Sequence, residues 1–172
     1  MRILITLSLF ISVIAFGQEN SGIDITNSEQ TLIGNWEFIQ TLDQNGKEIK
    51  KITLDRNTPD GKPITLNANG PDIIIKSDGT YTKMFTPENS DYGVWRIKSS
   101  NEIEYEMVIP ENSRQGQLII QTQKFFPDKK WRKDEKGNFL DASTDRIIEL
   151  TESEMKVEYE KDYILVYKKT AE

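Results

Sequence analysis

From Leu32 onward, hydrophobic and polar residues alternate along the chain with a period of two rather than 3.6. In the segment 102–109, Ile103, Tyr105 and Met107 alternate with glutamates, and the segment 154–160 repeats the pattern. Alternation of this kind is typical of strands that have one face in the core and the other in water. We therefore predict that the domain consists of β-strands.

Turn sequences separate these runs at short, regular intervals. Asn45-Gly46 is typical of a tight hairpin because both residues tolerate positive φ, and Asp78-Gly79 has the same character. The predicted strands are 72–76, 80–86, 92–98, 102–109, 146–150, 154–160 and 163–168. Strands at such spacing indicate an antiparallel meander.

Two predicted strands, 72–76 and 117–126, carry apolar residues on both faces. Such a strand is either covered on its second face or lies at an edge beside a partner. Closure into a barrel removes exposed edges, so we predict an all-β fold, an antiparallel up-and-down (meander) β-barrel of about eight strands. No amphipathic helix is predicted beyond a single turn near 28–32. The polar segments predicted as loops are 55–63, 111–116 and 127–144.

Residues 1–17 have the pattern of a signal peptide. Arg2 precedes an apolar run that ends at Ala15-Phe16-Gly17, with small residues at both cleavage positions, and the chain then turns polar. The run is short for a membrane anchor, which needs ~20 apolar residues. We expect a secreted protein, periplasmic or extracellular, with 18–31 as a flexible polar tether and no transmembrane segment after cleavage. Because the sequence has no cysteine, it cannot be a Cys-anchored lipoprotein.

The residue types that are missing exclude several kinds of chemistry. The sequence contains neither cysteine nor histidine. Thiolate nucleophiles, Ser-His-Asp triads and His- or Cys-ligated metals are therefore excluded, and we expect no enzyme, no cofactor and no metal site. The 22 Lys and Arg residues are outnumbered by 28 Asp and Glu residues, which makes nucleic acid a poor partner.

Several motifs follow one another along the chain: Leu32-Ile33-Gly34-Asn35-Trp36, Asp78-Gly79-Thr80-Tyr81, Gly93-Val94-Trp95-Arg96-Ile97 and Tyr163-Ile164-Leu165-Val166-Tyr167-Lys168. In this order they resemble the lipocalin-like domains exported by Bacteroidota, over residues 32–169. The resemblance implies that Gly34 and Trp36 close the barrel base. It also implies a cation from the last strand over the Trp36 ring. We assign that cation to Lys168, with Lys169 and Arg96 as alternatives.

A small barrel encloses either a ligand pocket or a solid core, and the sequence leaves both open. Aromatic and methionine side chains form adaptable apolar walls, and tyrosine hydroxyls can orient a polar group. The candidates for lining a ligand site are large residues at alternating positions: Tyr81, Phe85, Trp95, Tyr105, Met107, Met155 and Tyr159.

Two acidic segments invite a chemical interpretation. Glu102, Glu104 and Glu106 share one strand face at a spacing of ~7 Å, which suits acid–base catalysis, but such a row is more typical of a solvated face. The segment 55–61 faintly resembles a calcium loop. However, its glycine comes one place late and Leu66 stands where an EF-hand needs Glu, so we predict a polar turn.

The basic cluster Lys129-Lys130-Trp131-Arg132-Lys133 contains the candidates for an interaction surface. Trp131 can anchor an interface or touch an anionic surface together with Lys130 and Arg132. In the other interpretation, Trp131 packs against the barrel and the cations stay in water.

The leading hypothesis is non-catalytic binding of a small apolar or lipid-like molecule inside the barrel, in the cell envelope. The alternative is a protein-interaction or inhibitor module that acts on an envelope protein through the loops 55–63 and 127–144, around a solid core.

Overall fold

The protein is described here by a computed structural model, which covers residues 24–171 apart from 27, 59, 126–129 and 161, and omits the side chains of 55–57. The predicted signal peptide (1–17) and half of the predicted tether (18–23 and 27 of 18–31) lie outside the described residues.

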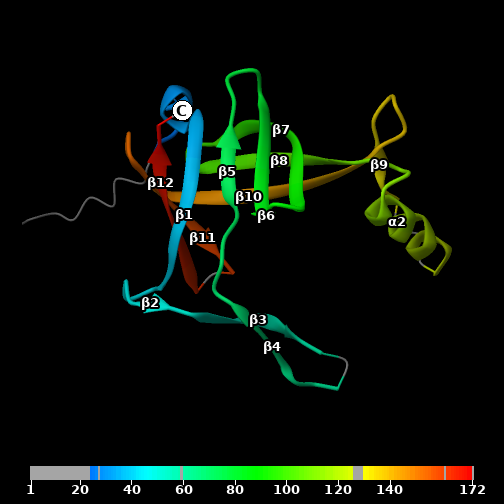
Figure 1. Ribbon diagram of the computed structural model, residues 1–172, viewed down its shortest axis with the longest axis horizontal. Helices are drawn as coiled ribbons and strands as arrows, with labels where there is room; N and C mark the ends of the chain where they lie inside the picture. Colours follow the sequence, from blue (N-terminus) through cyan, green and yellow to red (C-terminus); the bar gives the residue numbers. More distant parts are fainter. Residues whose placement is uncertain (1–23, 27, 59, 126–129, 161, 172) are drawn as a thin grey trace, which may run out of the picture.

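Eight antiparallel strands form a closed barrel (Figure 1). Each strand pairs with the next one along the ring, β10 pairs with β11, and β12 returns to β1. The predicted fold class, an antiparallel up-and-down β-barrel, is therefore confirmed. The barrel strands are β1 (Gly34–Asp43), β5 (Asp72–Ile75), β6 (Thr80–Thr86), β7 (Asn89–Ser99), β8 (Glu102–Ile109), β10 (Phe139–Leu150), β11 (Glu154–Tyr159) and β12 (Tyr163–Thr170).

One end of the barrel is closed by the short helix α1 (Glu29–Leu32), which lies at the beginning of β1 (Figure 1). Ile25 and Leu32 are fully buried there, and Trp36 is 1% exposed. The indole nitrogen of Trp36 donates a hydrogen bond to the carbonyl oxygen of Leu32 at 2.8 Å. The helix and the ring together fill this end of the core.

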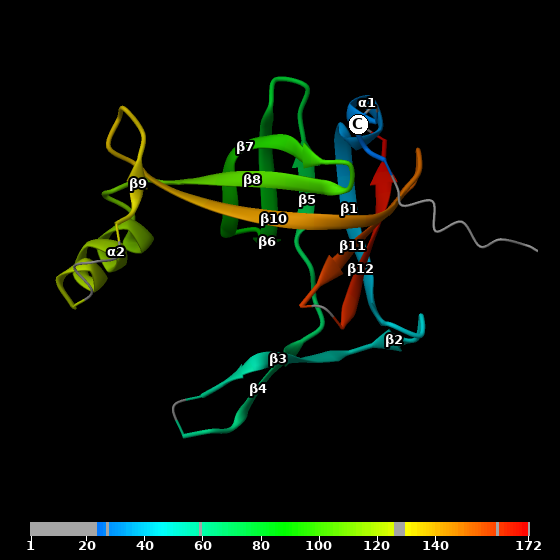
Figure 2. The ribbon, with the colours of Figure 1, turned by 180° about the vertical axis from the view of Figure 1, so that it is seen from behind.

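A hairpin projects from the opposite end of the barrel (Figure 2). It consists of β3 (Lys51–Asn57) and β4 (Pro63–Asn67), and β2 (Glu48–Ile49) leads into it from β1. Its apolar residues Ile52 and Leu54 are buried in a cluster that includes Tyr159 and Tyr163. The backbone N–H of Thr53 also donates to the Tyr163 hydroxyl at 3.1 Å. The hairpin is thus attached to the barrel through β11 and β12.

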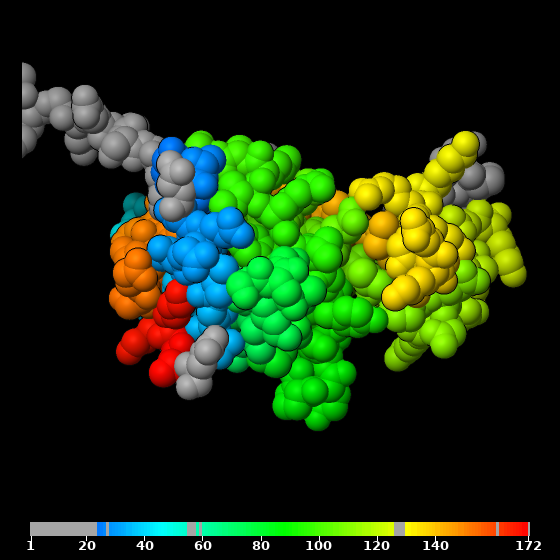
Figure 3. Space-filling model, turned by 90° about the horizontal axis from the view of Figure 1, so that it is seen from above, coloured from blue at the N-terminus to red at the C-terminus, as the bar shows by residue number. Residues whose placement is uncertain are grey.

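A second projection lies between β8 and β10, and Figure 3 shows it standing out from the barrel. It contains the helix α2 (Arg114–Phe125) and the short strand β9 (Arg132–Lys133), and we call it the α2–β9 lobe. Ile119 of the helix packs with Ile109 and Phe139 in a small core of its own.

The prediction of a strand at 117–126 is wrong, because most of this segment is in α2. The side chain of Ser113 accepts a hydrogen bond from the N–H of Gly116 at 3.0 Å, as an N-cap does. Gly116 also lets the helix approach the strand end, because a Cβ there would lie 2.3 Å from the carbonyl oxygen of Pro110. Ile119 and Ile120 pack in the core of the lobe, whereas Leu118 is exposed, so the apolar run does not alternate as that of a strand does.

The predicted loops are shorter than expected. In 127–144, the described part contains β9, and β10 already begins at Phe139. In 55–63, β3 continues to Asn57 and β4 begins at Pro63, which leaves only a hairpin turn. The beginning of β10 was predicted as a loop because its inward-facing positions carry Asp141, Ser143 and Asp145 instead of apolar residues.

Candidate functional site

The strand register identifies which side chains face the barrel interior, because directly paired residues point to the same side of a sheet. Lys83 pairs with the core residue Ile73 on one side and with Asp91 on the other. On β10, Asp145 pairs with the fully buried Ile103, and Asp141 pairs with Met107. Charged side chains therefore stand on the inner wall.

We call this group of inward-facing residues the polar chamber. Two of its members, Tyr81 and Tyr105, were predicted from the sequence, whereas the charged residues and Tyr167 were not. The chamber consists of Tyr81, Lys83, Asp91, Tyr105, Asp141, Asp145 and Tyr167.

An ion pair crosses the chamber from β6 to β10. The Lys83 ammonium lies 2.8 Å from a carboxylate oxygen of Asp145, and the two side chains are only 14% and 24% exposed. The same ammonium lies 3.8 Å from the centroid of the Tyr105 ring. Lys83 is thus held by a carboxylate and an aromatic face together, an arrangement that stabilises a partly desolvated cation.

Three tyrosine hydroxyls belong to the same chamber. Tyr105 and Tyr167 are 1% exposed and Tyr81 is 3% exposed, and the rings of Tyr81 and Tyr105 meet edge to face at 4.7 Å. Burial raises the pKa of all three hydroxyls, and the charge of Asp145 raises each pKa further. None of the three hydroxyls makes a hydrogen bond to another described residue. They remain protonated and keep their hydrogen-bonding capacity.

Asp91 is half-buried and has no ion pair or hydrogen bond with the described residues. Burial raises the pKa of its carboxyl group, Lys83 lowers that pKa in part, and Asp141 raises it again. Within the chamber, three carboxylates therefore face a single ammonium.

The chamber is open to solvent along β10. Asp141 and Ser143 point to the inside of the barrel, yet both are exposed. Ser143 lies directly opposite the buried Tyr105. Their exposure shows that solvent reaches the inner face of β10 at these two positions.

The predicted lining residues do not form one continuous wall. Trp95 lies toward the closed end, where its indole nitrogen donates to the carbonyl oxygen of Lys76 at 3.0 Å. Met155 is fully buried in the main core, Met107 packs toward the α2–β9 lobe, and Tyr159 contacts the β3–β4 hairpin. The structure places Phe85 at a β-bulge, 49% exposed, and only Tyr81 and Tyr105 belong to the polar chamber.

The cation at the barrel base is Lys169, and the assignment of Lys168 is wrong. β12 pairs Lys169 with Trp36 and directs Lys168 to the outer face, opposite Glu37. Gly34 has φ +141°, and a Cβ on it would lie 2.5 Å from the Lys169 side chain. Gly34 thus leaves the space that the Lys169 side chain occupies.

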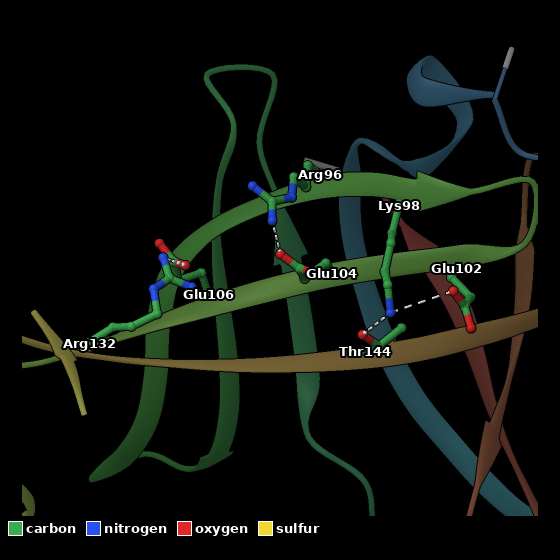
Figure 4. Close-up of polar contacts among 7 residues, drawn as sticks. All are labelled: Arg96, Lys98, Glu102, Glu104, Glu106, Arg132 and Thr144. Carbon is green, nitrogen blue, oxygen red and sulfur yellow. Dashed lines mark hydrogen bonds and ion pairs between the residues drawn. The ribbon is translucent and has the colours of Figure 1, made fainter. Parts of the chain in front are cut away.

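The glutamate row lies on the outer face of the barrel and is paired with cations (Figure 4). Glu104 contacts Arg96, Glu106 lies 2.6 Å from Arg132, and Glu102 lies 3.7 Å from Lys98. The row is a solvated, ion-paired face, as the pattern indicated.

The basic cluster divides into different environments. Trp131 is half-buried and packs edge to face on Phe139 at 6.4 Å. Arg132 is bound to Glu106, and Lys130 is exposed. In the segment proposed as a faint calcium loop, 55–57 belong to β3, and Asp60 pairs with Lys62 at 2.8 Å in the turn that follows.

Within the described part of the chain, no group of three acidic residues is close enough to hold a metal ion. None of the described helices has the length and hydrophobicity needed to cross a membrane.

No protein-family model and no curated protein sequence matches the chain. Two solved structures are similar to it. A lipocalin-like protein from Bacteroides uniformis shares 14% sequence identity, with 81% of this chain and 99% of that chain covered, and a TM-score of 0.43. An uncharacterized protein from Bacteroides eggerthii shares 18% identity, with 80% and 98% covered, and a TM-score of 0.39.

Proposed function

We propose that this chain is a non-catalytic binding protein that holds a small molecule inside the barrel, with the polar end of the ligand in the polar chamber. The single observation that supports the proposal is a set of hydroxyls, carried by three largely buried tyrosines beside the Lys83–Asp145 pair, none of them bonded to another described residue. A tyrosine hydroxyl can both donate and accept a hydrogen bond, so a ligand that enters the chamber can bond to these groups.

The wall beside the chamber suits an apolar or lipid-like body on the ligand. Phe38 meets Tyr167 edge to face at 6.0 Å, and Met107 faces inward beside Asp141. Together these rings and the thioether present an adaptable apolar surface next to the polar groups. The proposed setting is the cell envelope, which rests on the signal-like pattern of residues 1–17.

The test is a titration with 1-octanol, a neutral molecule with an apolar chain and one polar end, followed by amide NMR. We expect shifts at Tyr105, Ser143 and their neighbours. The variant Ser143→Phe fills the open part of the chamber and should abolish these shifts. Ala142→Phe is the matched control, because Ala142 is exposed on the opposite face of the same strand.

Two results would contradict the proposal. One is that octanol fails to shift the chamber amides, with no small molecule retained in native mass spectra of protein purified from its own cells. The other is that Ser143→Phe and Ala142→Phe bind octanol equally well, since binding would then lie outside the chamber.

A second function, a protein-interaction module, is favoured by a different observation. Both projections extend from the barrel (Figures 1 and 2), and α2 exposes Leu118 and Phe125, the latter at 79%. An exposed large apolar side chain on a helix is a feature of interfaces. Leu118→Ser with Phe125→Ser should abolish capture of an envelope protein by the full chain while octanol binding persists.

A further inference from the structure

We infer that the ligand of the polar chamber is an organic cation, an ammonium group on an apolar chain or ring, with its charge held by Asp91 and Asp141. The inference rests on the proposed function and specifies the class of ligand.

The charge of the chamber favours a cationic ligand. Lys83 neutralises Asp145 at 2.8 Å, whereas Asp91 and Asp141 have no ion pair with any described cation. Three carboxylates share the one ammonium of Lys83, so the inner wall carries an excess of negative charge that attracts a cation and repels an anion. For a carboxylate or phosphate ligand, the cation in the chamber is Lys83, which is already paired with Asp145.

The buried tyrosines supply hydrogen-bond acceptors for such a ligand in addition to the carboxylates. Tyr81 lies within the field of Asp91 and Asp141 and its ring meets that of Tyr105 at 4.7 Å. The two residues are 3% and 1% exposed, and their hydroxyls have no hydrogen-bond partner among the described residues. Their oxygens can accept hydrogen bonds from an ammonium, which has three N–H donors to satisfy. Carboxylates and hydroxyl oxygens together supply the acceptors that such a group needs.

The chamber already holds one ammonium group, that of Lys83, between a carboxylate and an aromatic ring. Lys83 contacts the Asp145 carboxylate and lies over the Tyr105 ring at 3.8 Å. The Tyr81 ring stands beside Tyr105, with 4.7 Å between the centroids, and Tyr81 lies within the field of Asp91 and Asp141. A ligand ammonium between these carboxylates would therefore have aromatic rings and acidic oxygens around it, as Lys83 has.

The experiment compares three probes that share an eight-carbon chain and differ only in their polar end: octylammonium, 1-octanol and octanoate. Binding is measured at pH 7 by calorimetry and amide NMR. We expect octylammonium to bind at least about tenfold more tightly than octanol and octanoate to bind most weakly, as the charge argument requires.

Substitutions then assign the charge preference to named residues. Asp91→Asn and Asp141→Asn should each weaken octylammonium binding about fivefold or more, and the double variant should weaken it further, while octanol binding stays within about twofold. Glu37→Gln is the matched control, because it removes one charge from the exposed outer face of β1. An unchanged amide spectrum establishes that each variant is folded.

The outcomes separate the two proposals. If octanol binds in the chamber but octylammonium has no advantage over it, the proposed function stands and the cationic ligand class is wrong. If Asp91→Asn and Asp141→Asn weaken all three probes equally, the residues shape the chamber without selecting charge, and the inference is again overturned. If no probe binds, the proposed function fails first.

Discussion

Lys169 and Trp36 close the barrel base as a pair that joins the first and last strands. The Lys169 ammonium lies 5.2 Å from the centroid of the Trp36 ring and donates a hydrogen bond to the carbonyl oxygen of Thr31 at 2.8 Å. One side chain of β12 thereby binds both the aromatic plug and the end of α1.

Removing the Lys169 ammonium should destabilise the barrel. For Lys169→Met we expect a loss of about 1–2 kcal/mol in the free energy of unfolding, from one cation–π contact and one hydrogen bond to a carbonyl. Urea unfolding measures it. Lys168→Met is the control, since Lys168 is exposed on the outer face, and its effect should stay below about 0.5 kcal/mol. Equal losses in the two variants would contradict the pairing.

The Lys83–Asp145 ion pair should show strong energetic coupling. Lys83→Met or Asp145→Asn alone leaves a partly buried group without its partner, at a cost of about 1–3 kcal/mol each. The double variant should lose clearly less than the sum of the two. The same cycle on Arg146 and Glu158, an exposed pair at 3.2 Å, should give coupling below about 1 kcal/mol. Similar coupling in both cycles would show that the interior pair is solvated like the surface one.

Asp91 should reduce stability at neutral pH. Its pKa is raised mainly by burial, against the lowering effect of Lys83 of β6 and with a further rise from Asp141 of β10. The folded state therefore binds a proton more readily than the unfolded state, and its stability falls as the pH rises from the unfolded pKa of 3.8 through the higher folded pKa. Tyr81, which also faces this carboxylate, stays protonated over that range.

The corresponding measurement is the unfolding free energy of Asp91→Asn against pH. At pH 7 the variant should be more stable than the parent by less than about 1 kcal/mol, because the carboxylate is still partly in water. The gain should shrink as the pH falls through the folded pKa of Asp91. A gain that is constant with pH, or a loss at pH 7, would show that the ionised carboxylate carries no penalty.

The N-cap of α2 can be weakened without touching the barrel. Ser113→Ala removes the hydroxyl that accepts from Gly116 and should cost about 1 kcal/mol of local stability. Hydrogen exchange should quicken in α2 and stay unchanged in β1, β5 and β12. Thr122→Ala, in the exposed part of the same helix, removes a hydroxyl bonded back to Leu118 and should leave exchange equal or slower.

The strands were predictable from sequence where one face is apolar and the other polar. β8 and β11 follow this rule, and the prediction placed them correctly. β12 does not show this alternation, because the consecutive residues Leu165, Val166 and Tyr167 are all buried. With both faces covered, the sequence does not reveal which of Lys168 and Lys169 points inward, and only the register with Trp36 decides it.

The polar chamber could not be predicted, because its charges violate the pattern on which strand prediction depends. Asp141, Ser143 and Asp145 occupy inward positions of β10, so that part of the strand resembles a polar loop. Lys83 of β6 pairs with Asp145 of β10, which lies 62 residues later in the sequence. Local alternation indicates which residues share a face, but not which distant charge stands opposite.

The pairing of β1 with β12 also determines when the barrel can form. Asn35 pairs with Thr170 and Asp43 with Tyr163, so the first strand finds its partner only after nearly the whole domain has been synthesised. Contacts between residues so distant in sequence slow folding, since the loop must close before the contact is gained. Until β12 docks, β1 and β11 each have an unpaired edge that other chains can join. Ring closure is therefore a late step, and the period before it is when this protein is most exposed to aggregation.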